Sequence, residues 1–338
     1  MAPSGEPVLW SLYVYAPNKG APIFFTITYG ISAFFHIWQC YRYKAWKLMW
    51  LHALCATLLT VGYALREWGA FNYLYSLTDK TPLIIFVLSQ VFIYVCPPLL
   101  ELSNYHILGR VFYYVPSCAP LPASRVLATF GGLMAAVEAL NAVGVSLAVN
   151  PSGDSQSLGK SLIIAAISMQ IVVIVTFVSL AALFHVRFVR ARIGSHAVRT
   201  ILLVLYASMT LIFVRCIYRL VEHSGNIEIE LNDIEVLRRL SPLLRYEVFF
   251  YVFEATLMLL NSWLWNAWHP GRFLPRENHI YLAEDGTEVT GEKEEDSRPL
   301  LAKMGHVLSF GILFRKTKGG HHRIHELSEF PPNDRGHS

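Results

Sequence analysis

Seven long apolar stretches dominate this sequence and restrict it to a membrane-spanning fold. Each supplies close to the 20 apolar residues that an α-helix needs to cross the hydrocarbon core of a bilayer. The chain is 54% hydrophobic and only 15% charged, whereas soluble domains are about 25% charged. We therefore predict an all-α membrane protein with a seven-transmembrane-helix bundle. The expected spans are Ala21–Tyr41, Leu48–Leu65, Pro82–Leu100, Val126–Ala148, Ser161–Phe184, Thr200–Leu220 and Tyr246–Ala267.

Basic residues in the connections predict how the bundle is oriented. The connections after spans one, three and five are rich in Lys and Arg, whereas those after spans two and four are poorer, with Lys80 and Lys160. By the positive-inside rule the N-terminus is then outside and the C-terminus cytoplasmic. We expect a short extracellular segment at 1–20, a membrane domain at 21–271 and a largely disordered cytoplasmic tail at 272–338.

Polar and charged residues in and next to the last two spans fall on matching helical faces. They are Arg215, Arg219 and Glu222 in span six, and Glu247, Tyr251 and Glu254 in span seven. Each set has the spacing i, i+4, i+7, which places its members on one side of an α-helix. A lipid-facing arginine costs about 2.5–3.5 kcal/mol at a helix centre, so we expect the two faces to meet. Arg215 and Glu254 lie deeper than the others, which alternatively reach the interface by snorkelling.

Other polar and proline residues lie at membrane depth. Glu138 and Asn141 occur on a small-residue face of span four, so the carboxyl group is either functional or a protonated acid bonded to another helix. Gln170 is expected to form an interhelical hydrogen bond. Pro97 and Pro98 should kink span three, as a packing solution or as a gate.

Several classes of function are disfavoured. Span seven has no lysine for a retinal Schiff base, and no nucleotide-binding loop or basic-aromatic patch for nucleic acid occurs. The histidines lie on different segments, which disfavours a zinc enzyme, and His321, His322 and His325 belong to a polar tail. We therefore expect no enzyme activity, no cofactor and no metal site. A seven-span receptor or sensor that acts without transporting substrate stays open as an alternative.

Several short motifs occur in a fixed order along the membrane part of the chain. They are Gly62-Tyr63-x-x-Arg66, Gln90, Pro97-Pro98, Tyr105, Gly109-Arg110, Gly159, Gln170, Arg215-x-x-x-Arg219-x-x-Glu222-x-x-Gly225, Glu247, Tyr251, Glu254 and His269-Pro270-Gly271. In these motifs the chain resembles the fungal lipid-translocating exporter family, of the aminocholesterol-resistance or sphingoid long-chain-base transporter type. It departs from the family at Leu59, Met134 and Asn141, where Glu, Asp and Gln are usual, and at Glu254, where Asp is common. Glu138 is a candidate replacement for the missing acid of span four.

The resemblance implies transport of amphipathic, lipid-like molecules, such as sphingoid long-chain bases and sterol-like or toxic compounds, in stress or drug resistance. It implies a fungal plasma membrane, or an endomembrane such as the vacuole or endoplasmic reticulum, with membrane lipids and the substrate as partners. The polar interior would take the head of the substrate while the tail stays in lipid. A cationic amine would suit Glu138 or Glu254, and an anionic head would suit Arg215.

Overall fold

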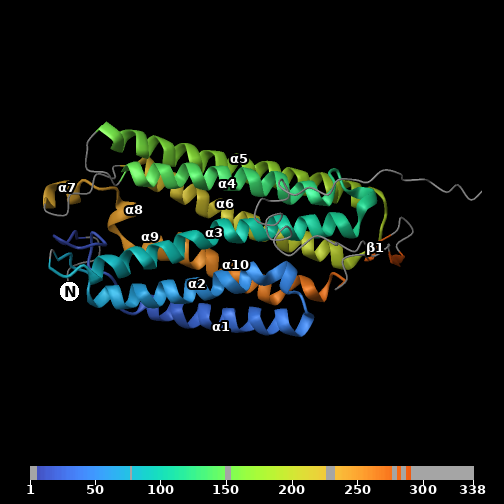
Figure 1. The fold of residues 1–338 in the computed structure, drawn as a ribbon, viewed down its shortest axis with the longest axis horizontal. Helices are drawn as coiled ribbons and strands as arrows, with labels where there is room; N and C mark the ends of the chain where they lie inside the picture. Colours follow the sequence, from blue (N-terminus) through green and yellow to red (C-terminus); the bar gives the residue numbers. More distant parts are fainter. Residues whose placement is uncertain are drawn as a thin grey trace, which may run out of the picture.

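The part of the chain that the structure describes contains seven helices that are long and apolar enough to cross a membrane. A computed structural model describes residues 6–76, 78–148, 154–225, 233–275, 280–282 and 287–290. The first six spans are α1 (Ala21–Tyr43), α2 (Trp46–Phe71), α3 (Thr81–Tyr114), α4 (Ala123–Ala148), α5 (Asp154–Arg190) and α6 (His196–Ser224). They lie side by side along the longest axis (Figure 1). The predicted seven-helix bundle is thus confirmed, and the chain is an integral multi-pass membrane protein.

The seventh span is not one regular α-helix. It consists of α9 (Glu247–Phe250), the π-helical turn η2 (Tyr251–Thr256), α10 (Leu257–Ala267) and the 3₁₀ turn η3 (Pro270–Arg272). The hydroxyl group of Thr256 donates a hydrogen bond of 2.8 Å to the backbone oxygen of Tyr251 in this turn. A π-helical turn pairs residues i and i+5, so each residue advances less around the axis than in an α-helix.

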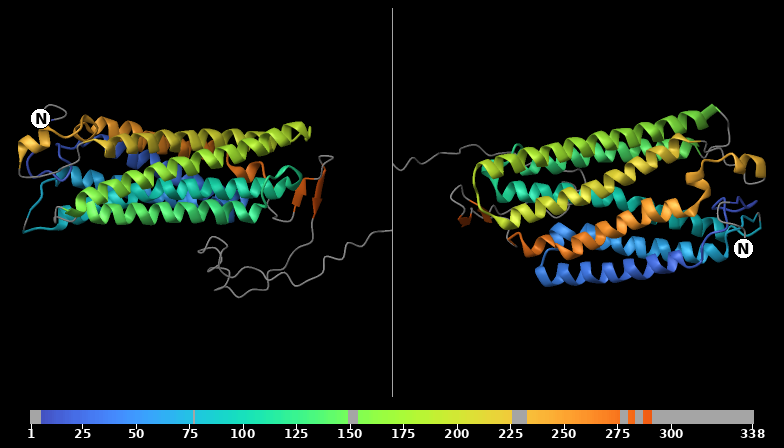
Figure 2. Two further views of the ribbon diagram at one scale, coloured as in Figure 1. Left: turned by 90° about the horizontal axis from the view of Figure 1, so that it is seen from above. Right: turned by 180° about the vertical axis from the view of Figure 1, so that it is seen from behind.

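Short elements mark the two ends of the bundle. The turn η1 (Pro116–Cys118) follows α3, while α7 (Ile234–Arg238) and α8 (Pro242–Arg245) precede the seventh span. Strands β1 (Ile280–Leu282) and β2 (Glu288–Thr290) pair in antiparallel fashion. The N-terminus lies with α7 and α8 at one end, and β1 lies at the other (Figures 1 and 2).

Spans two and three continue past the charged residues at which the predicted bounds end. The predicted second span stops before Arg66, but α2 continues to Phe71, and the predicted third span stops before Glu101, but α3 continues to Tyr114. Both charged residues are buried and hydrogen-bonded inside the bundle, so neither needs to end its helix at the membrane surface.

The first span packs against the seventh through polar side chains. The Asn266 side-chain amide donates a hydrogen bond of 2.7 Å to the hydroxyl group of Ser32. Gln39 donates to the backbone oxygen of Asn266 at 3.0 Å. Tyr29 donates to the backbone oxygen of Ala255 at 2.8 Å. Such interhelical bonds satisfy polar groups that lipid cannot satisfy, and here they hold the two ends of the membrane domain together.

Helices α4 and α5 come into close backbone contact at Gly144 and Gly159. A Cβ atom on Gly159 would lie 2.4 Å from the backbone nitrogen of Ala148 and 2.7 Å from the backbone oxygen of Gly144. Because glycine has no Cβ, the two backbones come into direct contact there. This contact fixes the position of α4, which carries Glu138.

Part of the segment expected to be a disordered tail has regular structure. The hairpin β1–β2 lies near the end of α3, where the Tyr114 hydroxyl group donates a hydrogen bond of 2.7 Å to the Glu288 carboxyl group. Arg110 donates to the backbone oxygen of Pro275 at 3.0 Å. Residues 291–338, with the three tail histidines, lie outside the described residues.

Candidate functional site

The two predicted polar faces meet at one ion pair in the middle of the bundle. The Nε atom of Arg215 in α6 donates to Oε1 of Glu254 in η2 at 2.6 Å. Only 7% of the Arg215 side chain and 1% of the Glu254 side chain are exposed. Each charge thus has an opposite charge in contact, as a buried ionic group requires.

The remaining members of the α6 face, Arg219 and Glu222, form hydrogen bonds within α6. Arg219 donates to Glu222 at 2.6 Å, and the Tyr218 hydroxyl group donates to the same carboxyl group at 3.3 Å. The Arg219 guanidinium lies over the ring of Tyr94 in α3, at 4.4 Å from the ring centroid. Arg219 and Glu222 therefore do not contact Glu247 or Tyr251 as α-helical spacing predicts.

Glu247 and Tyr251 contact Arg66 of α2 instead. The Arg66 guanidinium donates to Glu247 at 3.1 Å, to the Tyr251 hydroxyl group at 3.3 Å and to the Tyr15 hydroxyl group at 3.1 Å. It also lies 4.1 Å from the ring centroid of Phe250. The π-helical turn explains the division, because it rotates Glu254 relative to the residues before it.

The N-terminal segment completes the surroundings of Arg66. The backbone nitrogen of Asn18 donates to Oε2 of Glu247 at 2.7 Å, and the Tyr13 ring lies 4.8 Å from the Arg66 guanidinium. Burial raises the pKa of Tyr13 and of Tyr15 above the ordinary value for tyrosine, so both phenols stay neutral. Arg66 was not among the predicted site residues, although it ends a family motif.

A second acid, Glu101 of α3, lies deep inside the bundle. It is fully buried and accepts hydrogen bonds from the Tyr105 hydroxyl group and from Gln170 of α5, the latter at 2.8 Å. Gln170 thus forms the interhelical bond expected of it. Glu101 was missed because the predicted third span ended one residue before it.

Glu138 of α4 joins these groups from the side of the bundle. It is half-buried and interacts electrostatically with Arg215 and with Glu101. Five structural elements therefore contribute to one polar group, which we call the central cluster. Its members are Glu101, Glu138, Gln170, Arg215 and Glu254.

The central cluster has more acidic than basic groups. Three of its members are carboxylic acids, and Arg215 supplies its guanidinium to Glu254. The Oε2 atom of Glu254 is buried and has no hydrogen-bond partner among the described residues. Buried polar atoms of this kind are rare in folded proteins and are commonly met by water or a ligand. A protonated amine, a water molecule or a proton would fit an acceptor in such surroundings.

Pro97 and Pro98 lie inside α3, one turn before Glu101. Both are buried, and the helix continues through them. Because proline has no backbone N–H, the carbonyl groups of Ile93 and Tyr94 lack their helical partners. The backbone is thus less constrained next to the central cluster than elsewhere in α3.

A separate polar region contains His36 and His52, whose proximity the sequence does not predict. The rings of His36 and His52 lie 5.6 Å apart, and His52 shares a hydrogen bond of 2.8 Å with Ser103. Both rings are buried, and each has one nitrogen atom without a partner among the residues that are described. Within the described ranges, no group of three or more His, Cys, Asp or Glu residues has the geometry to hold a metal ion.

Comparison with known proteins gives a consistent picture. The family model of RTA1-like proteins matches residues 52–277. The chain is 54% identical over 344 positions to a lipid-translocating exporter-like protein RTA1 of Leptosphaeria maculans, covering 100% of this chain. It is 32% identical to a protein of that name from Ajellomyces capsulatus, over 69% of this chain and 74% of the relative.

A third relative is more distant. The chain is 24% identical to a probable lipid transporter, atnI, of Emericella nidulans, over 78% of this chain and 68% of the relative. The chain spans 66% of the length of the Leptosphaeria maculans relative. No solved structure is significantly similar.

Proposed function

Because the chain belongs to the RTA1-like protein family, we propose that it moves amphipathic, lipid-like molecules across or out of a bilayer. The names of its relatives, which describe lipid-translocating exporters and a lipid transporter, support this role. It is a transport role without a chemical reaction on the substrate. The substrates we propose are sphingoid long-chain bases and sterol-like or toxic compounds, whose removal would contribute to stress or drug resistance.

The observation that carries the proposal is the unpartnered Oε2 atom of Glu254 in an acid-rich cluster. Arg215 already pairs with Glu254, whereas Glu101 and Glu138 form no ion pair in the described part of the chain. An additional positive charge would balance these carboxyl groups, and an additional negative charge would not. This balance favours a substrate with a protonated amine head over one with an anionic head.

Glu138 supplies a route from the lipid to the cluster. Its side chain is half-buried on α4, whose residues Leu133 and Val143 are exposed on the outer surface of the bundle. In our proposal the substrate head meets Glu138 first and then Glu254, while its tail stays in the surrounding lipid. The weakened helix at Pro97 and Pro98 serves as the gate next to this route.

We further propose a plasma-membrane location, with a fungal endomembrane as the second choice. The N-terminus would be outside and the C-terminus cytoplasmic, because the basic connections α1–α2, α3–α4 and α5–α6 lie at the end that carries β1 (Figure 1). The substrate would then leave the cell through the bundle.

The direct test is release of a labelled sphingoid base from yeast that expresses the chain. We expect faster release than with an empty vector, and loss of this gain in Glu254→Gln and Glu138→Gln. Glu235→Gln is the matched control, because Glu235 is 65% exposed and pairs only with Arg238 in the described structure. The amount of each variant in the membrane is measured in parallel.

Two variants keep this test decisive. Glu254→Gln breaks an ion pair and lowers stability, whereas Glu138 has no ion pair to lose in the described structure. Normal release by Glu138→Gln and Glu254→Gln would overturn the proposed route. No release by the unaltered chain present in the membrane would favour a receptor or sensor that does not transport substrate.

A further inference from the structure

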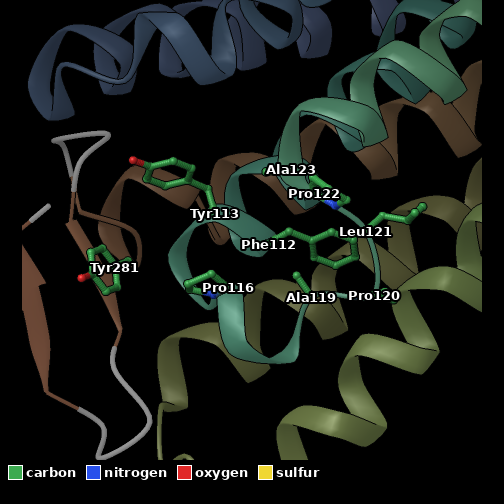
Figure 3. Close-up of a pocket in the computed structure, with 9 residues that line it drawn as sticks. All are labelled: Phe112, Tyr113, Pro116, Ala119, Pro120, Leu121, Pro122, Ala123 and Tyr281. Carbon is green, nitrogen blue, oxygen red and sulfur yellow. The ribbon is translucent and has the colours of Figure 1, made fainter. Parts of the chain in front are cut away.

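A basic pocket lies at the end of the bundle that carries β1, away from the central cluster. It has a volume of about 470 Å³ and is lined by Ser117, Cys118, Arg187, Arg190, Ala191 and Ile193. A second, apolar pocket of about 420 Å³ lies beside η1 and is lined by side chains that include Phe112, Pro116, Pro120 and Tyr281 (Figure 3). The two pockets share the turn Pro116–Cys118.

The two arginines of the basic pocket form no salt bridge with the described residues. Arg187 and Arg190 are three residues apart in the last turn of α5, so they lie on the same face. Both are exposed, and neither forms an ion pair with an acid in the part of the chain that the structure describes. Two guanidinium groups on one wall, with the Ser117 hydroxyl group on another, form a set of donors suited to a phosphate group.

The position of the pocket along α5 indicates the source of that phosphate. Leu183, Val186 and Val189 are apolar and about half exposed on the same helix, at 56%, 48% and 47%. In a membrane protein such side chains face lipid tails. The arginines therefore lie where the lipid-facing surface of α5 ends, at the level of the phospholipid head groups.

We propose that the basic pocket binds the phosphate-bearing head group of an anionic membrane phospholipid. Arg187 and Arg190 bind the phosphate, and the acyl chains lie along the exposed apolar face of α5. Free phosphate has the same charged group but no chains, so it binds far more weakly. The site is independent of the transported molecule, because its residues do not belong to the central cluster.

Native mass spectrometry of the full chain in detergent tests the proposal. Short-chain phosphatidylserine is the probe, and phosphatidylcholine of equal chain length is the uncharged comparison. We expect the double variant Arg187→Gln/Arg190→Gln to bind phosphatidylserine about tenfold more weakly or worse. Arg192→Gln is the matched control. Arg192 lies two residues after Arg190 and carries the same charge, but its side chain does not line the pocket.

Three results would overturn the proposal. The first is equal binding of phosphatidylcholine and phosphatidylserine by the unaltered chain. The second is an equal loss of binding in Arg192→Gln, which would indicate general attraction to a positive surface. The third is displacement of the lipid by inorganic phosphate at the same concentration, which would make free phosphate the ligand. Thermal unfolding of each variant checks that it is folded, which we expect because both side chains are exposed.

Discussion

Glu254 accepts a hydrogen bond of 2.6 Å from Arg215 through one carboxyl oxygen, while its other carboxyl oxygen has no partner among the described residues. One oxygen of the carboxyl group thus fixes the side chain, and the other is where our proposal places the head of the substrate. This arrangement separates the structural role of the ion pair from its proposed role in transport, so the two can be measured independently.

Removing one charge of the Arg215–Glu254 ion pair should destabilise the protein more than removing both charges. Arg215→Gln leaves Glu254 buried without an opposite charge, and we expect the free energy of unfolding to fall by about 3–5 kcal/mol. The double variant Arg215→Gln/Glu254→Gln removes both charges and should recover most of this loss without recovering transport. Thermal unfolding in detergent measures the first effect and substrate release measures the second. A double variant as unstable as the single variant would contradict the expectation.

Arg66 should not tolerate replacement by lysine. Its guanidinium bonds three side chains and lies against aromatic rings, whereas an ammonium group cannot reach all of them from one position. We expect Arg66→Lys to lower the free energy of unfolding by about 2 kcal/mol. Arg238→Lys serves as control, because that arginine is 61% exposed in its ion pair with Glu235. Its effect should stay within about 0.5 kcal/mol.

The contact between α4 and α5 should be sensitive to a single methyl group. In Gly159→Ala the new Cβ atom would meet the backbone of Ala148, so the helices must separate. We expect a loss of about 1–3 kcal/mol in the free energy of unfolding, with reduced transport because α4 carries Glu138. Gly194→Ala is the matched control, since among the described residues no atom beyond its two chain neighbours lies within 4 Å of its added Cβ. Equal melting temperatures for the two variants would argue against this contact.

The π-helical turn should be necessary for the two ion pairs to exist together. Deleting Val252, which is 46% exposed, removes the additional residue and restores α-helical pairing. The residues on either side then rotate relative to each other by about 100°. We expect the coupling energy between Arg66 and Glu247, measured by a double-mutant cycle, to fall towards zero in the deletion variant. Val252→Ala should preserve it, and an unchanged coupling energy after the deletion would refute the role of the turn.

Hydropathy and helical spacing predict the membrane architecture and one contact of the site. The seven spans are recognisable because each must cover the same bilayer thickness, and Arg215 must find an acid because lipid offers none. Hydropathy fails at Arg66 and Glu101, since it treats a charge as the end of a span even where the side chain is buried and paired.

Other parts of the site depend on information that one sequence does not contain. Regular spacing places Glu247, Tyr251 and Glu254 on one face, but the π-helical turn divides them between α2 and α6. His36 and His52 occur singly in their spans, and only the packing of α1 on α2 brings their rings together. Which helix a polar residue faces is decided by neighbours far away in the chain.

The hydrogen bonds between the first and seventh spans have a consequence for biosynthesis. Tyr29 and Ser32 bond residues that follow them by 226 and 234 positions. Ribosomes add about 5–20 residues per second, so the polar groups of α1 wait on the order of ten seconds or longer for their partners. During that time the hydroxyl groups of Tyr29 and Ser32 lack these partners from the seventh span. A chain interrupted before its last helix would therefore keep an unpaired polar surface in the membrane, where quality-control factors can recognise it.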